Sequence, residues 1–400
     1  MKIAIIGGGA AGCFCAIGAK RRLPDADVTL FEAGPKLLAK VAVTGGGRCN
    51  LTNSFRDVER LAEVYPRGEQ LMRRALRVLS PADTQRWFEA EGVRLVTQED
   101  QCVFPVSQDA MQIVRTLERC LRQEGVHVRL NAPVERIAVQ EGRFGIEIPG
   151  QARDDYDKVV VTVGGSSRDK LERLLPEGVA VTDCVPSLFT LKVPDTGLRA
   201  LMGTVVPRAA LALAGTKFRA AGTLLLTDWG VSGPATLRLS SYAARHLAGN
   251  GYSGTLLINW LDASEADVRG WIAAAAAANP QKQAAGTPPE GLTARLWRHL
   301  LQRAQLREDL RWAELGSKGA ARLAATLTAD AYPVAGRARF KEEFVTCGGV
   351  DLSGLSLGTL ESKAYPGLFF AGEALDVDAI TGGFNLQAAW STAALVAAAL

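Results

Sequence analysis

The chain begins with a short apolar run that passes directly into a glycine-rich turn, and this start constrains the fold more than any other feature. Lys2 to Ile6 is predicted to form a buried strand, and Ala10 to Arg22 a helix. The next predicted strand, Val28 to Phe31, completes a β-α-β unit, which implies a parallel sheet. The turn itself, Gly7 to Gly12, has the spacing G-x-G-x-x-G.

This spacing favours a site for the phosphates of a dinucleotide. Gly7 permits the tight turn, Gly9 lets the backbone approach a pyrophosphate, and Gly12 allows close packing of helix on strand. The start of the helix adds free N–H groups and a positive dipole end. Glu32 ends the second strand about 20 residues past the turn, where a carboxylate binds ribose hydroxyls. The alternative is a tight turn that binds nothing.

A second glycine motif follows at residues 44–53, with the sequence TGGGRCNLTN. Its three consecutive glycines, Gly45 to Gly47, allow the backbone to lie against a flat ring because no side chain intervenes. Arg48 is a fixed cation suited to an anionic cofactor. Asn50 and Asn53 can read amide-like edges of a ring. A flexible surface loop is the alternative interpretation.

A third motif lies near the end of the chain. The predicted strand Leu368–Ala371 is followed by Gly372 and Glu373, and a loop through Gly383 leads to a helix that begins near Asn385. The start of this helix could point at the pyrimidine ring of a flavin, where its positive end would stabilise the anion that forms on reduction. Glu373 would accept hydrogen bonds from the ribityl chain. The alternative is that the acids of this loop, Asp376 and Asp378, are only solvated charges.

The length of 400 residues is too great for one simple core and indicates two or three domains. From Pro186 short apolar runs alternate with glycines, from Asp262 to about Asp330 the pattern is helical, and after Phe340 the α/β character returns. The predicted fold class is therefore α/β, with a Rossmann-like dinucleotide-binding domain interrupted by an insertion. Its expected parts are the Rossmann-like domain (1–186 and 341–400), a β-rich domain (187–261 and 331–340) and a small helical domain (262–330).

The composition excludes several other classes of protein. The net charge is +4 without a block of Lys and Arg, which makes nucleic acid an improbable partner. No apolar span is long enough to cross a membrane. Seven scattered cysteines and three histidines lack the spacing of a disulfide framework or a metal site. The N-terminal apolar run is too short for a signal peptide, so we expect a cytoplasmic protein.

Three segments, TGGGRCNLTN, DWGVSGP and GLFFAGEALDVDAITGGFNLQAAW, occur in this order. Together they resemble the BaiN-type (YhiN-like) NAD(P)/FAD-dependent oxidoreductases over essentially the whole chain. The resemblance implies a flavoprotein whose Rossmann-like FAD domain carries an inserted β-rich domain and a smaller helical domain. The FAD contacts that the resemblance implies are Ala11, Glu32, Lys40, Arg48, Asn50, Val134, Glu373, Asn385 and Leu386. Val134 is among them because residues 131–137, NAPVERI, resemble the family segment whose backbone contacts adenine.

One position departs from the family pattern. The middle motif commonly reads T-H-x-G-x-S-G-P, and Asp228 stands here in place of the histidine. A histidine could act as an acid near neutral pH, whereas Asp228 could do so only with a strongly raised pKa. The catalytic acid or base is therefore not assigned, and a part for Asp228 stays open. Cys49 could take part in thiol–flavin chemistry, but it has no partner cysteine in the sequence, which favours a structural role.

The leading functional prediction is an FAD-dependent oxidoreductase that transfers hydride from NAD(P)H through the flavin to a small organic acceptor such as a conjugated carbonyl compound. Only one complete dinucleotide fingerprint is present in the sequence, so NAD(P)H is expected to bind next to the flavin only transiently. An RNA-modifying flavoprotein and a non-enzymatic flavin-binding redox sensor are the alternatives. The sequence does not choose between NADH and NADPH, and it predicts no oligomeric state.

Overall fold

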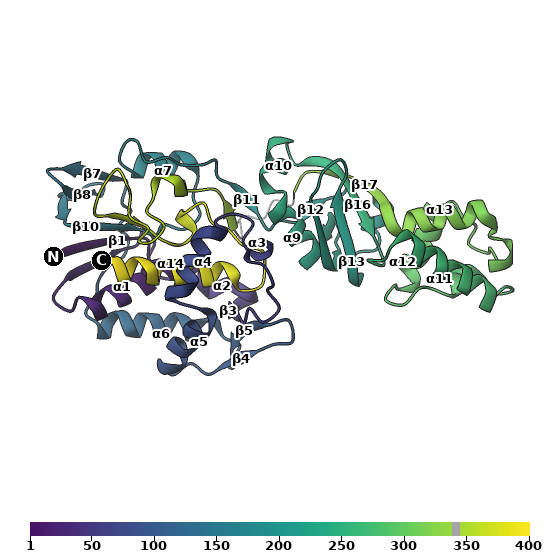
Figure 1. Cartoon of the computed structure of the whole chain (residues 1–400), viewed down its shortest axis with the longest axis horizontal. Helices are drawn as coiled ribbons and strands as arrows, with labels where there is room; N and C mark the ends of the chain where they lie inside the picture. Colours follow the sequence, from purple (N-terminus) through teal and green to yellow (C-terminus); the bar gives the residue numbers. More distant parts are fainter. Residues whose placement is uncertain (338–344) are drawn as a thin grey trace. The chain divides into compact units, whose positions relative to one another are not determined.

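The computed structural model describes residues 1–337 and 345–400, which form two compact units (Figure 1). The first unit comprises Met1–Val185 and Val345–Leu400, and the second comprises Pro186–Phe344. Strands β11 (Val185–Ser187) and β18 (Val345–Cys347) lie at the two boundaries. The predicted insertion into an α/β domain is thus confirmed. The finer division of the insertion into a β-rich and a helical domain stays a prediction, and its boundary at 340/341 falls outside the described residues.

The centre of the first unit is a five-stranded parallel sheet with the order β19-β10-β1-β2-β6. Its strands are β1 (Lys2–Ile6), β2 (Asp27–Phe31), β6 (His127–Arg129), β10 (Lys158–Val161) and β19 (Leu368–Phe370). The inner strands are continuous apolar runs because a parallel sheet of this kind is covered on both faces. β19 comes from the C-terminal part of the chain, so the sheet is complete only after the insertion.

Two helices that are buried over most of their length cover one face of this sheet. They are α1 (Ala10–Arg22) and α14 (Phe384–Ala399), and they pack against each other. Small residues permit the close approach: a Cβ on Gly18 would lie 3.0 Å from the Cβ of Ala397. The charged residues of α1 are confined to its last turn, Lys20 to Arg22, and most of the apolar remainder of the helix is buried. Figure 1 shows both helices on the opposite side of the sheet from the hairpin β7–β8.

The remaining elements of the first unit surround this centre. Two antiparallel sheets are formed by β3 (Thr52–Asn53), β5 (Cys102–Pro105) and β4 (Leu95–Thr97), and by β7 (Arg136–Gln140), β8 (Arg143–Glu147) and β9 (Asp154–Tyr156). The helices are α2 (Ala39–Gly47), α3 (Leu61–Val64), α4 (Glu69–Val78), α5 (Pro81–Ala90), α6 (Ala110–Gln123) and α7 (Arg168–Leu174), with the short 3₁₀ helices η3 (Leu352–Gly354) and η4 (Gly372–Ala374).

The second unit is built on a six-stranded sheet with the order β12-β15-β14-β13-β16-β17, antiparallel at each pairing. Its strands are β12 (Leu191–Lys192), β13 (Val205–Leu213), β14 (Arg219–Leu226), β15 (Gly230–Ser232), β16 (Ser253–Asn259) and β17 (Asp330–Ala335). The helices are α8 (Thr196–Arg199), α9 (Pro234–Tyr242), α10 (Ala244–Gly249), α11 (Glu265–Ala278), α12 (Ala294–Arg303) and α13 (Gly316–Ala329), with η1 (Ala284–Gly286) and η2 (Trp312–Glu314).

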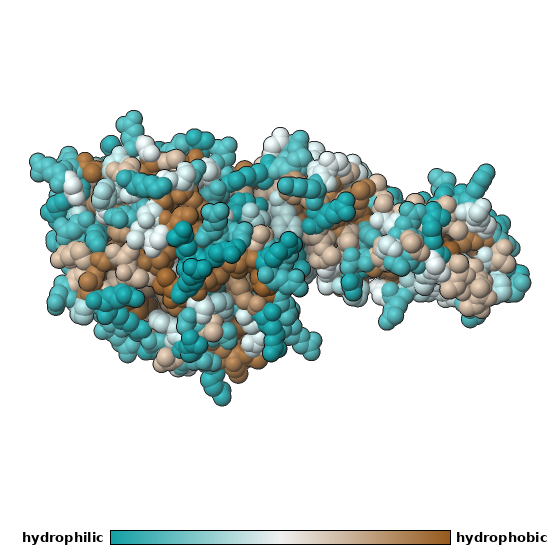
Figure 2. Space-filling model, in the orientation of Figure 1, coloured by the Kyte–Doolittle hydropathy of each residue, from teal (hydrophilic) through white to brown (hydrophobic). Residues whose placement is uncertain are grey.

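The surface of both units is largely hydrophilic in the face that Figure 2 shows, with smaller hydrophobic patches between the polar side chains. The most exposed large apolar side chains include Val43 and Met202. Among the described residues, no helix combines the length and the apolar character that a membrane crossing requires.

A buried carboxylate organises the junction of strands and helices in the second unit. Asp330, at the start of β17, accepts hydrogen bonds from Trp260 Nε1 at 3.1 Å and from Arg303 Nε at 2.7 Å. Asp330 is 4% exposed, so its charge depends on these partners. Arg303 also lies over the ring of Tyr332 at 4.1 Å. One carboxylate therefore ties α12 to two strands of the sheet.

Replacing this carboxylate should destabilise the second unit. We expect Asp330→Ala to lower its free energy of unfolding by about 3 kcal/mol, because the cation of Arg303 and the indole N–H lose their buried partner. Urea denaturation followed by tryptophan fluorescence measures the change. The control Arg269→Ala breaks the exposed pair with Glu265 and should cost less than about 0.5 kcal/mol. Equal midpoints for the two variants would contradict this account.

Candidate functional site

The first glycine turn is sterically closed at two of its positions. Gly7 has φ +109°, and a Cβ there would lie 2.5 Å from the carbonyl oxygen of Thr162. A Cβ on Gly12 would lie 1.9 Å from the oxygen of Gly7. The Thr162 hydroxyl lies 2.9 Å from the Gly7 oxygen and donates to it. The turn can be this tight only with glycine at both positions.

Gly9 differs, because a Cβ at this position would meet nothing within 4 Å. Gly9 is also the N-cap of α1, and no side chain caps the helix. The first N–H groups of a helix, here including that of Ala11, have no acceptor within the helix. The open space beside Gly9 therefore borders unsatisfied donors and a positive dipole end, a combination that suits a phosphate.

Glu32 joins the end of β2 to this turn. Its Oε2 accepts a hydrogen bond from the N–H of Gly8 at 2.9 Å, and its Oε1 accepts one from the N–H of Gly34 at 2.7 Å. Both oxygens of the half-buried carboxylate thus have a backbone donor. The remaining lone pairs of a carboxylate can still accept hydrogen bonds from a ribose, since each oxygen offers two.

The segment that contains Val134 lies beside Glu32. The N–H of Ala132 donates to the oxygen of Glu32 at 2.9 Å, and the N–H of Asn131 donates to that of Gly34 at 3.0 Å. The half-buried Val134 follows two residues later. The structure therefore brings together Glu32 and the segment for which the sequence predicts contact with adenine.

The second glycine motif interrupts α2. Gly45, Gly46 and Gly47 have φ values of +57°, +69° and +83°, so the chain leaves the helical path in a conformation that favours glycine. A Cβ at Gly46 or Gly47 would meet nothing within 4 Å. Arg48 is exposed, lies over the ring of Phe104 at 4.6 Å, and donates from Nε to the oxygen of Gly45 at 3.1 Å.

The second and third motifs meet at the start of α14. Gly383 has φ +90°, and a Cβ there would lie 2.3 Å from the oxygen of Thr52. The side-chain amide of Asn50 links the two segments, since its oxygen accepts from the N–H of Gly383 at 3.2 Å and its nitrogen donates to the oxygen of Thr52 at 2.9 Å. Asn53 Nδ2 donates to the oxygen of Gly382 at 3.1 Å. The side chains of Asn50 and Asn53 in the second motif thus fix the backbone of the third motif by hydrogen bonds.

The helix α14 begins at Phe384, next to its predicted start near Asn385, and has no side-chain cap. The side chain of Asn385 turns back into the preceding loop, where Oδ1 accepts from the N–H of Ala379 at 2.9 Å and Nδ2 donates to the oxygen of Ala379 at 3.1 Å. The backbone N–H groups of Asn385 and Leu386, at the uncapped end of the helix, therefore have no acceptor within the helix.

Glu373 lies close to the phosphate turn. Its Oε2 is 3.0 Å from Lys40 Nζ, and its Oε1 accepts from the N–H of Thr346 at 2.9 Å. The preceding Gly372 has φ +71°, and a Cβ there would lie 2.7 Å from the Cβ of Ala11. The structure therefore brings Lys40, Glu373 and the start of α1 together, as the predicted site requires.

The structure corrects one interpretation and adds residues that sequence reasoning did not assign. Asp378 is not a solvated charge: it is fully buried and forms an ion pair with Arg67. Asp376 is half-buried. The YPRG sequence at residues 65–68 was the available signal, but it named no partner. Thr162 and Thr346, which hold the turn and Glu373, carry no recognisable sequence signal.

Cys49 is fully buried within the second motif. Burial raises the pKa of its thiol to about 12, because the thiolate loses its hydration. A thiol of this kind does not form the nucleophilic thiolate near neutral pH. The structure thus favours the structural role of Cys49 over thiol–flavin chemistry.

Asp228 lies in the second unit, in the turn between β14 and β15, and is exposed. The N–H of Thr227 donates to the oxygen of Gly230 at 2.8 Å and closes the turn. Gly230 has φ +151°, and a Cβ there would lie 2.4 Å from the oxygen of Leu191. The motif therefore has a defined backbone, and a part for Asp228 in catalysis stays open.

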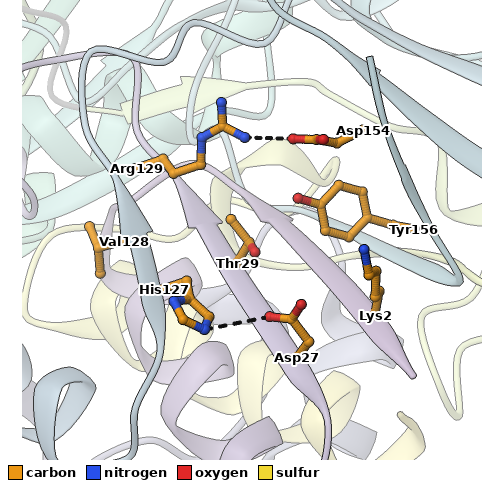
Figure 3. A pocket seen from close by; sticks show the side chains of 8 residues that line it. All are labelled: Lys2, Asp27, Thr29, His127, Val128, Arg129, Asp154 and Tyr156. Carbon is orange, nitrogen blue, oxygen red and sulfur yellow. Dashed lines mark hydrogen bonds and ion pairs between the residues drawn. The ribbon is translucent and has the colours of Figure 1, made fainter. Parts of the chain in front are cut away.

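A cleft of about 450 Å³ lies in the first unit (Figure 3). Two pairs of its polar side chains face one another: Arg129 and Asp154 approach to 2.7 Å, and His127 and Asp27 to 3.8 Å. It is lined by Lys2, Asp27, Thr29, His127, Val128, Arg129, Asp154 and Tyr156. None of them is a predicted site residue. Residues 1–337 and 345–400 contain no cluster of side chains suited to a metal ion.

Comparison with known families decides what this architecture is. Residues 1–399 match the family described as "HI0933-like protein Rossmann domain". The chain belongs to this family. The predicted membership in the BaiN-type (YhiN-like) flavoprotein oxidoreductases is thereby confirmed, and so is the Rossmann character of the first unit.

Two relatives resemble this chain over nearly their whole length. One, from Clostridium scindens, is named 3-dehydro-bile acid delta(4,6)-reductase and is 29% identical over 98% of this chain and 97% of the relative. The other, from Escherichia coli, is named ribosomal RNA dihydrouridine synthase and is 31% identical over 97% of this chain and 95% of the relative.

The fold also resembles that of a solved structure, a 3-ketosteroid delta1-dehydrogenase from Sterolibacterium denitrificans. The TM-score is 0.50, the sequence identity is 12%, and the match covers 99% of this chain and 98% of the other. At this identity the likeness concerns the fold alone.

The buried thiol gives a first test of the site. We expect Cys49 to remain unmodified by iodoacetamide in the native protein at pH 8, because a pKa of about 12 leaves roughly one thiol in ten thousand ionised. The thiolate fraction rises only as the pH approaches 12. Peptide mass spectrometry measures the modification, and the same sample in urea is the control. Rapid labelling of native Cys49 would contradict the buried, protonated state.

Proposed function

We propose that this protein is an FAD-dependent oxidoreductase that reduces a carbon–carbon double bond conjugated to a carbonyl group. The observation that carries the cofactor assignment is the open space beside Gly9, at the uncapped start of α1 and next to Glu32. An adenine dinucleotide binds at this edge of a parallel sheet through the same three elements: a glycine turn, a helix start and an acid.

The residues present fit an extended FAD molecule. Glu32 and the segment before Val134 would bind the adenosine, and the N–H groups at Gly9 and Ala11 would bind the pyrophosphate. Glu373 would accept hydrogen bonds from the ribityl hydroxyls, with Lys40 holding the carboxylate in place. These proposed roles are supported by the position of the groups near the carboxyl ends of β1, β2 and β19.

The flavin-ring end would be formed by the glycine motif and the start of α14. The open side of Gly46 and Gly47 presents backbone without side chains, which suits a flat ring. The uncapped N–H groups of Asn385 and Leu386 provide partial positive charge. When bound, FAD supplies hydride transfer, and the protein supplies position and electrostatic stabilisation. The α14 terminus would favour the negative charge that reduction places on the ring.

The substrate chemistry follows from what the two relatives' names share. A 3-dehydro compound with double bonds at positions 4 and 6 is a conjugated dienone, and the 5,6 double bond of uridine is conjugated to a ring carbonyl. Each name therefore describes addition of two hydrogens to a double bond that a carbonyl polarises. In such a reduction the hydride adds to the carbon β to the carbonyl, and a general acid delivers a proton to the α carbon.

A uracil base in RNA is the second candidate substrate, since a relative of 31% identity is named a ribosomal RNA dihydrouridine synthase. The identities to the two relatives are too similar to decide between a small enone and RNA. The sequence pI of about 8.7 is compatible with either. The prediction that nucleic acid is not a partner stays a prediction, as does NAD(P)H as the reductant.

The reductant is tested first. We expect the purified protein to carry FAD and its flavin absorbance to bleach within seconds when NADH or NADPH is added without oxygen. The visible spectrum in an anaerobic stopped-flow cell measures this. Protein that neither contains flavin nor takes up added FAD would refute the proposal. A bound flavin that NADH and NADPH leave oxidised would point to another donor or to a redox sensor.

The substrate is tested on the reduced protein. Reoxidation by a 3-keto-4,6-diene steroid, with a product two mass units heavier, supports the small enone. Appearance of dihydrouridine in unmodified ribosomal RNA, detected by nucleoside mass spectrometry, supports RNA. The matched control for each is the saturated compound or the already modified RNA, which should leave the flavin reduced.

A glycine substitution tests the phosphate site. We expect Gly9→Ala to weaken FAD binding by at least about tenfold, or about 1.4 kcal/mol, because a methyl group would stand where the phosphates approach. The fold should be retained, since the Gly9 backbone is in the extended region and a Cβ there meets no atom within 4 Å. Titration of FAD into deflavinated protein measures the affinity. The control Gly270→Ala, also in open space, should bind FAD like the wild type.

A further inference from the structure

The loop that leads from β19 to α14 is fastened by a buried ion pair. Arg67 Nε lies 2.6 Å from Oδ1 of Asp378, and Nη2 of the same guanidinium contacts Oδ2. The side chains are 12% and 0% exposed. A two-pronged contact of this kind fixes both the distance and the orientation of the carboxylate.

The backbone follows the same alignment. Arg67 and Asp378 form an antiparallel bridge, and the N–H of Ile380 donates to the oxygen of Val64 at 3.0 Å. A Cβ on Gly68 would lie 2.3 Å from Cγ2 of Val377, so the two segments touch without room for a larger residue. Residues 64–68 therefore fix the backbone position of residues 377–380.

The fixed residues 377–380 lie just before the two glycines of the loop, Gly382 and Gly383. Gly382 and Gly383 have φ values of +123° and +90°, and glycine can adopt many other conformations. Beyond them, the buried hydroxyl of Tyr65 donates to the oxygen of Phe384 at 2.9 Å. The same short segment thus holds the chain on both sides of the two glycines, and it sets where α14 begins.

Stability alone does not account for an ion pair at this place. Removing two charges from water costs much of what their attraction returns, and apolar side chains of similar volume often serve as well. What the ion pair adds is a single geometry, because the planar guanidinium donates its two hydrogen bonds to the carboxylate in one orientation.

We propose that Arg67 and Asp378 are positioning residues for the flavin ring. Through the 377–383 loop they fix the N–H groups at the start of α14, and so set the electrostatic stabilisation of the reduced ring. This inference rests on the proposed function, since it takes the flavin to lie at that helix terminus. Neither side chain is assigned contact with the flavin.

Two variants separate positioning from folding. Arg67→Lys keeps the charge and loses the fork. The double variant Arg67→Met/Asp378→Leu removes both charges without leaving one buried and unpaired. The control Arg21→Lys alters a partly buried arginine with two carboxylate partners, Glu91 and Glu124, at the other end of α1. The measurements are thermal unfolding, FAD affinity, the reduction potential of bound FAD, and hydrogen exchange of peptides covering residues 380–388, all on the full chain.

Both test variants should fold and bind FAD roughly tenfold more weakly, which corresponds to about 1.4 kcal/mol. Their bound FAD should have a more negative reduction potential, and residues 380–388 should exchange faster than the rest of the first unit. The control should match the wild type in all four measurements.

Two results would overturn the proposal while leaving the proposed function intact. One is wild-type affinity, potential and exchange in both variants. The other is faster exchange throughout the first unit with an unchanged potential, which would mean that the pair only stabilises the fold. A wild-type protein that binds no FAD would instead refute the proposed function, and this inference with it.

Discussion

The hydrogen bonds that tie the carboxyl ends of the parallel strands together are the constraint on which the rest of the first unit depends. The N–H of Gly7 donates to the oxygen of Phe31 at 2.8 Å, that of Thr162 to Ile6 at 2.8 Å, and that of Ala371 to Val161 at 3.1 Å. Each bond begins where a strand has just ended. The loops that follow the strands must therefore leave from one edge, and the groups that can bind a dinucleotide are collected there.

Closing that edge requires the C-terminal part of the chain. β19 supplies the last strand next to β10, and α14 packs along α1. The start of α1 and the start of α14 are both uncapped, so the site has two helix termini with unsatisfied N–H groups. In the proposed function one serves the pyrophosphate and the other the flavin ring. The insertion of the second unit therefore separates the two halves of the site in sequence without separating them in space.

Local patterns made much of this predictable. β1 and α1 have the predicted bounds because an apolar run and a helical run meet at a glycine turn, and every signal involved lies within a few residues. The pairing of Arg67 with Asp378 was not predictable, since 311 positions separate the two residues and an acid in a polar loop is usually solvated. The role of Thr162 was hidden for the same reason, because its partner, the Gly7 oxygen, lies 155 positions away in the sequence.

In the proposed function, the reduction of a conjugated carbonyl makes one demand that the residues proposed to bind FAD do not meet. Hydride addition to the β carbon leaves negative charge on the carbonyl oxygen and the α carbon, which must be stabilised and then protonated. The residues gathered at the sheet edge of the first unit are occupied by one another or assigned to FAD. Asp228, at the position where the family commonly has histidine, is exposed in the second unit and is one candidate for the proton donor. The rate and pH dependence of substrate reduction, measured separately from flavin reduction, should therefore identify the proton donor. A loss of rate in Asp228→Asn that is confined to substrate reduction would identify Asp228 as the donor. An unchanged rate would mean that the proton comes from another group near the substrate or from water.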